Sequence, residues 1–215
     1  MSRVSPHLPG FVAGNLCLDF VNTVDPRHAD DRDDYLCNYD RLLDWSVAAG
    51  LIEPADRSDL DRCARADPLG ADGVYQRALT LREALYRLLA PGSSGSGPPD
   101  PSAAESLNEE IRLASSRAAI EPTQHGWAWA WDDASSRLDR VLWPIARAAA
   151  ELLTSPTSSR IRECEGSNGC GWLFIDASKN GRRRWCDMRV CGNRAKARRH
   201  SQRQRAASSP DASST

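Results

Sequence analysis

Four cysteines near the C-terminus are the residues whose type and spacing best fit a single chemical task. They form two pairs, Cys164 and Cys170 in "CEGSNGC" and Cys186 and Cys191 in "CDMRVC", and fifteen residues separate the pairs. Two such pairs can surround one tetrahedral zinc ion, because a tight loop brings each pair to one side of the metal. The sequence therefore predicts one structural zinc ion with four thiolate ligands.

Four thiolates close the coordination shell of zinc, whereas a catalytic zinc keeps one position open for water. His200, nine residues after Cys191, is an alternative ligand that would replace one cysteine. The other histidines are scattered at positions 7, 28 and 125, and the sequence has no nucleophile motif or phosphate-binding loop. We therefore expect that the chain is not an enzyme.

The remaining cysteines are Cys17, Cys37 and Cys63, which bring the total to seven. An odd number fits a disulfide framework poorly. The N-terminus has no apolar run that would serve as a signal-peptide core, and no stretch approaches the roughly 18 apolar residues of a membrane span. We therefore expect a cytoplasmic protein with no membrane contact. We expect Cys17 and Cys63 to be buried thiols and Cys37 to lie at the edge of a loop.

The formal net charge of −1 hides an uneven distribution of charge along the chain. Residues 1–159 contain 15 arginines, no lysine and 24 acidic residues, which gives a formal charge of −9. Residues 160–205 contain 11 arginines and two lysines against four acidic residues, which gives +9. A basic segment attached to an acidic body is typical of nucleic-acid-binding proteins. DNA is therefore the expected partner of the segment that holds the cysteine pairs.

The segment 160–205 has too few apolar residues for a core of its own, so zinc must supply most of its stability. We expect the spacer between the cysteine pairs to form a hairpin, and a basic helix to start at Cys191. The residues predicted to contact nucleic acid are Arg183, Arg184, Arg194, Lys196, Arg198, Arg199 and Arg203. Arg194 is also expected to brace the metal loop. The competing interpretation is a solvated basic face or a tail that only aids solubility.

Residues 1–155 are predicted to form a mainly helical body with its own core. Apolar residues repeat at helical spacing most clearly in 73–90, where Val74, Ala78, Leu81, Leu85 and Leu88 share one face. Further helices are expected in "GNLCLDFVNTV", in "YDRLLDWSVAAG", after Pro54, at 102–117 and at 134–153. The Gly-, Ser- and Pro-rich stretch 91–102 predicts a flexible loop inside the body, and 206–215 predicts a disordered tail.

After residue 118 the spacing of the apolar residues changes from helical to alternating, which predicts one β-hairpin in this helical body. Trp127, Trp129 and Trp131 alternate with alanines after the turn sequence "TQHG". Two interpretations stay open: the hairpin buries the tryptophans against the helices, or they form a surface that stacks on an aromatic ligand or a base. We favour burial, because aromatic side chains dominate cores. The fold class expected is α+β: a mainly helical body with a small hairpin, then a small zinc finger that ends in a basic helix.

Polar residues on the first predicted helix are candidates for a small-molecule site. Asp19, Asn22 and Thr23 share one helical face, and Arg27 follows shortly after. These residues line a ligand pocket, or they form a hydrogen-bond network that holds the next loop; we favour the network. The acidic loop 25–34 is expected to be solvated, and the alternatives are that it binds a cation or folds back on the finger.

Two parts of the sequence resemble known families. The stretch "CGWLFIDASKNGRRRWCDMRVCGNRAKARRH" resembles the CGNR-type zinc finger, whose signature is spelled by Cys191, Gly192, Asn193 and Arg194. The stretches "GNLCLDFVNTV" and "LWPIARAAAELLTSPTSSRIRECE" resemble the two ends of the ABATE domain, which commonly precedes this finger in bacterial proteins described as stress-induced transcription regulators. The interval between Cys164 and Cys170 is longer than in the family pattern, so the first metal loop is expected to differ in shape.

The resemblance implies a zinc-finger transcription regulator that binds DNA and responds to stress. Its N-terminal body would sense a small-molecule effector or form a homodimer. The alternative is a zinc-stabilised adaptor whose finger binds protein or RNA. A steep salt dependence of binding to duplex DNA, together with a sequence preference, separates these two hypotheses.

Overall fold

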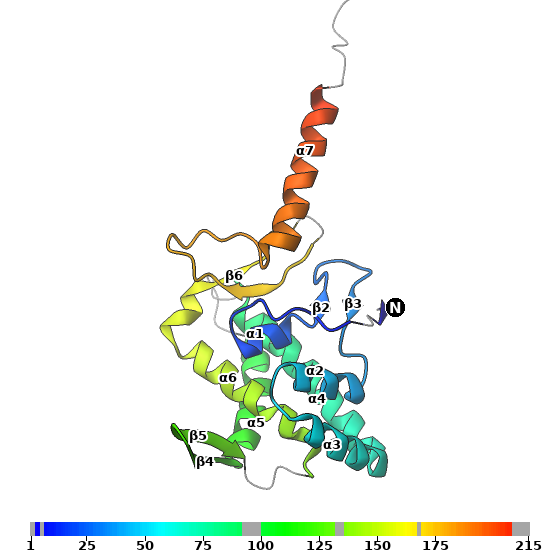
Figure 1. Ribbon diagram of the computed structural model, residues 1–215, viewed down its shortest axis with the longest axis vertical. Helices are drawn as coiled ribbons and strands as arrows, with labels where there is room; N and C mark the ends of the chain where they lie inside the picture. The colour runs from blue at the N-terminus through cyan, green and yellow to red at the C-terminus, as the bar shows by residue number, and fades with distance from the viewer. Residues whose placement is uncertain (1–2, 5–6, 92–99, 132–135, 167–168, 208–215) are drawn as a thin grey trace, which may run out of the picture.

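The computed structural model describes residues 3–4, 7–91, 100–131, 136–166 and 169–207 of the chain. A bundle of helices forms the body, the finger lies at one end of it, and a β-hairpin lies at the other end (Figure 1). The last helix projects from the finger, away from the body (Figure 1). Most of the loop predicted at 91–102 and most of the tail predicted at 206–215 fall outside the described residues.

The helices account for most of the described chain. The α-helices are α1 (Leu16–Val21), α2 (Tyr39–Ala48), α3 (Pro54–Ala66), α4 (Pro68–Leu89), α5 (Pro101–Ser115), α6 (Trp143–Leu153) and α7 (Asn193–Ala207). The shorter helical turns are the 3-10 turns η1 (Leu138–Val141) and η2 (Pro156–Arg160) and the π-helical turn η3 (Met188–Gly192).

The strands are short and form three small sheets. They are β1 (Arg3–Val4), β2 (Val24–Asp25), β3 (Asp33–Asp34), β4 (Ala118–Thr123), β5 (Gly126–Trp131), β6 (Ile161–Glu163) and β7 (Leu173–Ile175). Strand β3 pairs with β1 in parallel and with β2 antiparallel, while β4 with β5 and β6 with β7 form antiparallel pairs. The fold class predicted from the sequence, α+β with a mainly helical body, is confirmed.

Two helix boundaries differ from the sequence prediction, and proline explains both. The helix predicted at 73–90 begins earlier, at Pro68, because the Asp67 side chain accepts a hydrogen bond from the Gly70 N–H and proline suits the first turn. The helix predicted at 134–153 is shorter. The 3-10 turn η1 precedes α6, which begins at Trp143 so that Pro144 lies in its first turn rather than in its interior.

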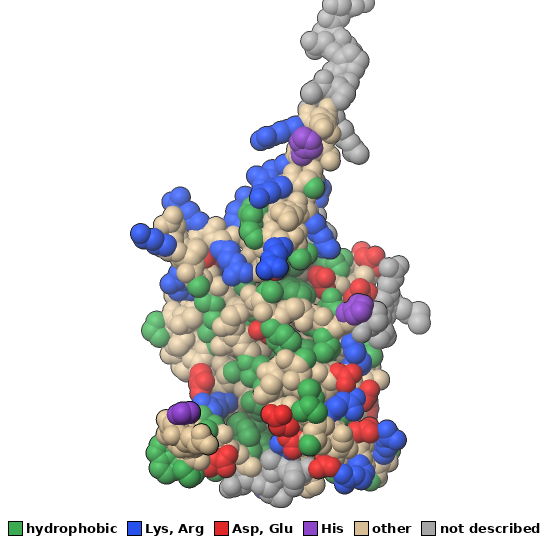
Figure 2. Space-filling model, viewed as in Figure 1, with side chains coloured by type: hydrophobic (Ala, Val, Ile, Leu, Met, Phe, Trp, Pro, Cys, Tyr) green, Lys and Arg blue, Asp and Glu red, His purple; other side chains and the backbone are tan. Residues whose placement is uncertain are grey.

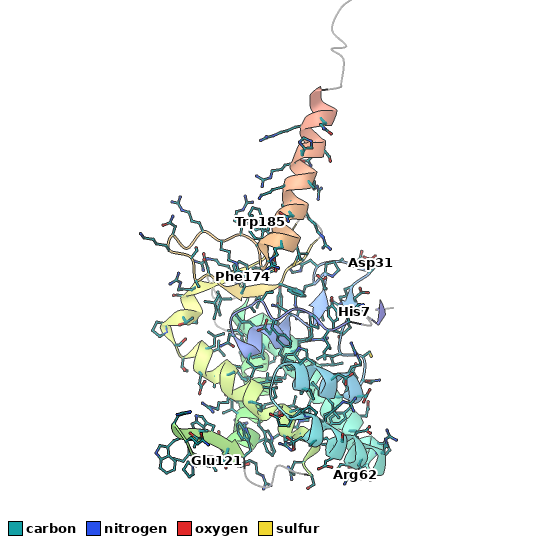
Figure 3. All side chains as sticks on the ribbon, in the orientation of Figure 1. His7, Asp31, Arg62, Glu121, Phe174 and Trp185 are labelled. Carbon is teal, nitrogen blue, oxygen red and sulfur yellow. The ribbon has the colours of Figure 1, made fainter. Side chains whose placement is uncertain are left out.

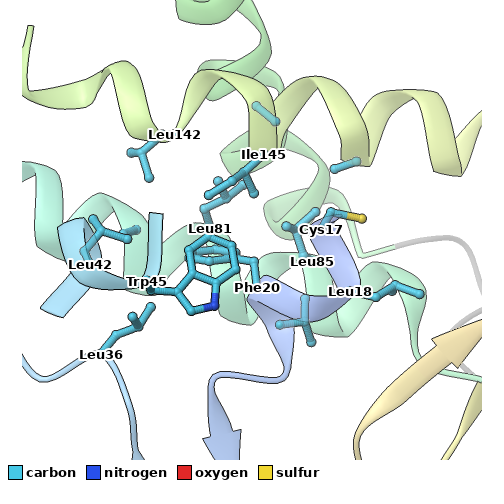
Figure 4. Close-up of a cluster of buried hydrophobic side chains, with 14 of the residues drawn as sticks. Cys17, Leu18, Phe20, Leu36, Leu42, Trp45, Leu81, Leu85, Leu142 and Ile145 are labelled. Atoms are coloured by element: carbon cyan, nitrogen blue, oxygen red, sulfur yellow. The ribbon is translucent and has the colours of Figure 1, made fainter. Parts of the chain in front are cut away.

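The core of the body surrounds α4, which packs against α1, α2, α3 and α5. Figure 4 shows Phe20 of α1 and Trp45 of α2 among side chains from α4 and α6. Both aromatic side chains are fully buried, and their ring centroids lie 5.4 Å apart. Burying a large apolar side chain contributes about 1.5–3 kcal/mol. This core holds α1 in place, and α1 in turn supports the finger.

The predicted hairpin is present, but it packs on the body only in part. Strands β4 and β5 pair from Ala118↔Trp131 to Thr123↔Gly126. Trp131 packs against Trp143 with ring centroids 5.7 Å apart. The prediction that the tryptophans are buried is wrong for Trp127 and Trp129, which are 72% and 51% exposed. The reason is that the hairpin projects sideways from the bundle (Figure 1). One side of the Trp129 ring packs on the Arg147 guanidinium of α6, 3.9 Å from the ring centroid, and the other side stays exposed.

The finger shares the hydrophobic core of the body through β7. Leu173 and Phe174 are fully buried, and they belong to the same cluster of apolar side chains as Phe20 and Trp45. Strand β7 pairs with β6, so the strand pair encloses the first cysteine loop. The prediction that the spacer between Cys170 and Cys186 forms a hairpin is wrong, because the partner of β7 lies before Cys164 rather than inside the spacer.

Candidate metal centre and basic surface

The four predicted ligands converge at the base of α7. Cys164 follows β6, Cys170 ends the loop before β7, Cys186 precedes the π-helical turn η3, and Cys191 lies within that turn. All four side chains are buried, and their Sγ atoms lie within 4.8 Å of one another. Residues separated by 27 positions in the sequence are thus brought to a single point.

The spacing of the sulfur atoms fits a zinc ion. With a Zn–S bond of about 2.3 Å, the corners of a tetrahedron lie about 3.8 Å apart. The Sγ atoms of Cys170 and Cys186 are 3.8 Å apart, as are those of Cys186 and Cys191. Zinc bound here supplies a cross-link between the first cysteine loop and the start of α7. Because the cysteines provide four ligands, the ion has a structural role.

The electrostatics of the thiols favour a bound cation. The Cys186 N–H donates to Sγ of Cys164 at 3.3 Å. Hydrogen bonds with the Cys170 and Cys186 thiols lower the pKa of Cys164, whereas the contacts of Cys170 with Cys164 and Cys186 raise the pKa of Cys170. One thiolate therefore forms readily, but four thiolates this close repel one another. A divalent cation removes that repulsion, which couples metal binding to the loss of the thiol protons.

The first metal loop lies against the loop that follows α1. The Arg27 N–H donates to the Cys170 carbonyl (2.9 Å), and the His28 N–H donates to the Gly169 carbonyl (3.0 Å). Gly171 has a φ of +65°, and a Cβ atom there would lie 2.6 Å from Cδ2 of His28. Only glycine fits this position without strain. The loop 25–34 thus folds back on the finger, one of the alternatives left open, and it does so through its backbone.

The predicted polar residues of α1 make contacts within the protein. Asn22 holds β7, because its side chain donates to the Leu173 carbonyl and accepts from the Leu173 N–H, both at 2.8 Å. Asp19 accepts from the Ala13 N–H at 3.0 Å, and burial raises the pKa of its carboxyl group. Thr23 accepts a hydrogen bond of 3.2 Å from Arg82.

Arg27, the fourth residue of the predicted small-molecule site, lies beside these contacts. Its guanidinium pairs with Glu83 at 3.0 Å and lies 4.0 Å from the ring centroid of Tyr86. Burial lowers the pKa of this guanidinium. The contacts of the four residues join α1, α4 and the finger, which is what the network interpretation predicts. A role in binding a small molecule stays a prediction.

The other candidate metal ligands lie apart from the four thiols. Cys17 is fully buried in the core, where burial raises the pKa of its thiol, and Cys37 and Cys63 are half-buried. His200 lies on the exposed part of α7, where its ring contacts Gln204. In the described part of the chain, Cys164, Cys170, Cys186 and Cys191 form the group that can hold a metal ion.

The basic residues predicted on the last helix are exposed. These residues are Arg194, Lys196, Arg198, Arg199 and Arg203, all on α7. Figure 2 shows lysine and arginine side chains gathered over the finger and α7, whereas acidic side chains are concentrated on the body. Arg194 lies at the start of the helix and faces the body, where its charge lowers the pKa of Asp25 against the stronger effect of burial. Arg194 was predicted to brace the metal loop, whereas in the structure its charge acts on Asp25 of the body.

Arg183 and Arg184 have contacts inside the finger. The Arg183 Nε–H donates to the Trp185 carbonyl (2.8 Å), and its guanidinium lies 4.5 Å from the ring centroid of Phe174. Arg184 is exposed and pairs with Glu165 at 2.5 Å. Figure 3 shows Phe174 and Trp185 close to the base of α7, where these contacts hold the metal loop. Arg183 therefore supports the structure of the finger.

Three further basic residues enlarge the charged surface. Lys179 and Arg182, on the loop after β7, and Arg189, in η3, are exposed. Their charge is part of the +9 of residues 160–205, but most of the nucleic-acid contacts predicted from the sequence lie on the helix. The dense run "SKNGRRRW" was the signal that marks this loop as a second basic element.

Comparisons with known proteins agree with this architecture. Residues 14–156 match the ABATE family model, described as "Putative stress-induced transcription regulator", and residues 160–204 match the CGNR zinc finger model. A search of curated proteins gives no match. Among the described residues, no helix has the length and apolar character needed to cross a membrane. The first model covers most of the chain, and the second coincides with the four-thiol site. The chain therefore belongs to the ABATE family and carries a C-terminal CGNR zinc finger that holds one structural zinc ion.

Proposed function

We propose that this protein regulates transcription by binding duplex DNA through α7 and the basic loop 177–184. The observation that carries the proposal is a basic, exposed helix that projects from a zinc-closed finger, away from an acidic body (Figures 1 and 2). A major groove about 12 Å wide admits an α-helix. The 15 residues of α7 span about 22 Å at a rise of about 1.5 Å per residue. The helix therefore has the dimensions of a groove-binding element.

The basic residues lie on two sides of α7, which suits a helix placed between two phosphate backbones. Arg194 and Arg198 are four residues apart and share one side of the helix. Lys196, Arg199 and Arg203 share the opposite side. In a major groove, Arg198 on the first side and Lys196, Arg199 and Arg203 on the second would approach the phosphates of different strands, while Arg194, at the base of the helix, faces the body. Phosphate contacts would fix the orientation of the helix, and its remaining side chains would reach the base edges.

The zinc site supports this role by fixing the direction of the helix. Cys191 lies in η3, which continues directly into α7, so the metal ties the start of the helix to the first cysteine loop. We propose no catalytic role for the ion, because four thiolates leave it no open position for water or substrate. A small-molecule effector for the helical body stays a prediction from the sequence.

The proposal is tested by titrating duplex DNA fragments with the zinc-loaded protein at several salt concentrations. Binding should weaken steeply with salt, and the double variant Arg198→Ala/Arg199→Ala should reduce the slope by about one unit per lost phosphate contact. A matched control is Arg62→Ala/Arg65→Ala, which removes two exposed arginines from α3 of the body. The control should bind like the wild type. Equal salt slopes for the α7 variant and the wild type would reject the DNA contact.

The adaptor hypothesis predicts a different result in the same experiment. An adaptor that binds RNA would prefer duplex or single-stranded RNA over duplex DNA at equal salt. An adaptor that binds protein would show only weak nucleic-acid binding without sequence preference. A specific DNA fragment preferred at least a thousandfold over random DNA is the outcome expected for a regulator.

A further inference from the structure

We propose that two copies of this chain associate through their hairpins, with strand β5 of one copy pairing antiparallel with β5 of the other. The proposal concerns the end of the body opposite to the finger (Figure 1). It does not depend on DNA binding.

Strand β5 has an open hydrogen-bonding edge. Within the described chain, β5 pairs only with β4. Pro122 has no N–H, so the pair Pro122↔Trp127 cannot exchange backbone hydrogen bonds. Because such pairs alternate along an antiparallel ladder, the pairs of Trp129 and Trp131 are also of the non-bonded type. The N–H and C=O groups of Trp127, Trp129 and Trp131 therefore point away from β4.

The two edges of the hairpin differ in how well they are protected against pairing with another strand. The outer edge of β4 is interrupted by Pro122 and flanked by the charged Glu121, which are devices that discourage pairing with another strand. Strand β5, "GWAWAW", has no charge and no proline. A six-residue strand with these properties is a template for another strand. The open edge of β5 is thus unprotected, while that of β4 is protected.

A second copy of β5 fits the open edge of β5. Two identical strands place equal side chains near the symmetry axis, so a charge close to the axis would face its own copy. Strand β5 itself carries no charge. The nearby Arg147 of α6, whose guanidinium lies 3.9 Å from the ring centroid of Trp129, is paired with Glu151 at 2.7 Å. With the two-fold axis at Trp129, this residue lies opposite Trp129 of the second copy, and Trp127 lies opposite Trp131 of the second copy. Every outward N–H and C=O of these three residues then has a partner.

The exposed apolar side chains of the hairpin also favour pairing of two copies through β5. Trp127, Trp129 and Trp131 point to one face of the hairpin, together with Ile120 and Pro122 of β4. Ile120 is 60% exposed, and Trp127 and Trp129 are 72% and 51% exposed. Figures 2 and 3 show this apolar surface at the tip of the hairpin, near Glu121. Pairing through β5 joins two such faces into one, and tryptophan is one of the residue types enriched at interface hot spots.

The test compares two proline variants of the full, zinc-loaded chain by sedimentation equilibrium. The wild type should have twice the 23.6 kDa mass of one chain. Trp129→Pro removes the N–H at the two-fold axis, so the dimer dissociation constant should rise at least tenfold. Ile120→Pro is the matched control, because Ile120 lies directly opposite Trp129 and its N–H points to the outer edge of β4. The control should remain dimeric.

Three results would overturn the proposal: a monomeric wild type at 100 µM, dimers in both proline variants, or monomers in both. The last result would indicate that the tryptophan faces stack on each other instead of pairing at the β5 edge. If Trp129→Pro does not fold, Trp127→Lys replaces it, because that side chain is 72% exposed. A lysine there should also weaken the dimer at least tenfold, since it places a positive charge in each copy at the shared edge.

Discussion

Asn22 on α1 and Leu173 on β7 exchange a pair of hydrogen bonds, each 2.8 Å long, across 151 residues of sequence. Both residues are buried, and the pair fastens the finger to the body. The Ile175 N–H donates to the Ala13 carbonyl at 2.9 Å, and the Trp172 indole N–H donates to the Val24 carbonyl at 2.8 Å. The zinc finger is therefore fixed to the body, and its helix has a defined direction.

Asn22→Ala should destabilise the protein and speed the release of zinc. The change leaves the buried N–H and C=O of Leu173 without partners, which costs about 1–3 kcal/mol for each unsatisfied group. Thermal denaturation measures the loss of stability, and a zinc indicator dye measures release. Asn108→Ala is the control, because Asn108 is exposed on α5 and its loss should change stability by less than about 0.5 kcal/mol. Equal melting temperatures for the two variants would contradict the docking role.

Removing zinc should lower the melting temperature of the helical body as well as unfold the finger. The sequence alone predicted that the body would be independent, but Leu173 and Phe174 lie in its core. Structural zinc contributes on the order of 10 kcal/mol, and its loss frees β7 to leave the core. Far-UV circular dichroism with and without chelator follows this effect, since most of the helix belongs to the body. An unchanged midpoint would show that the finger and body fold separately.

Gly171→Ala should loosen the first metal loop more than Gly181→Ala does. Both glycines have positive φ angles, +65° and +61°, so both changes carry the same backbone strain. A Cβ at residue 171 also meets His28, whereas at residue 181 the nearest atom is 4.0 Å away. The rate of zinc release reports the difference. Adding His28→Ala should bring the Gly171 variant part of the way back to the rate of the Gly181 variant, because Cβ of Arg27 still lies 3.1 Å from the added Cβ. No recovery would refute the contact with His28.

Arg182→Ala and Arg183→Ala change adjacent residues but should have different effects, the first on DNA binding and the second on stability. Arg182 is exposed, so its loss should weaken DNA binding and lower the salt slope by about one unit with stability unchanged. Arg183 supports the Trp185 carbonyl and the Phe174 ring, so its loss should lower the melting temperature. Thermal melts and DNA titrations on both variants measure the two effects. The same melting temperature for both variants would contradict the structural role of Arg183.

The sequence predicted the parts of this structure that depend on local pattern. Cysteine spacing identified the ligand set, and apolar periodicity placed the helices. The contact between Asn22 and Leu173 could not be predicted, because no local pattern links residues so far apart. The alternation of Trp127 and Trp129 showed that they share a face, but the burial of that face depends on where the body ends. The structural role of Arg183 was missed because its charge resembles that of its neighbours.

The most direct test of the account is the affinity for duplex DNA before zinc removal, after it, and after zinc is restored. The account holds that zinc gives α7 its fixed direction, so affinity should fall at least tenfold without metal and recover with it. A flexible basic tail would bind equally well in all three states, because its charge does not depend on zinc. The same affinity with and without zinc would therefore contradict the central claim that the metal-closed finger presents α7 to DNA.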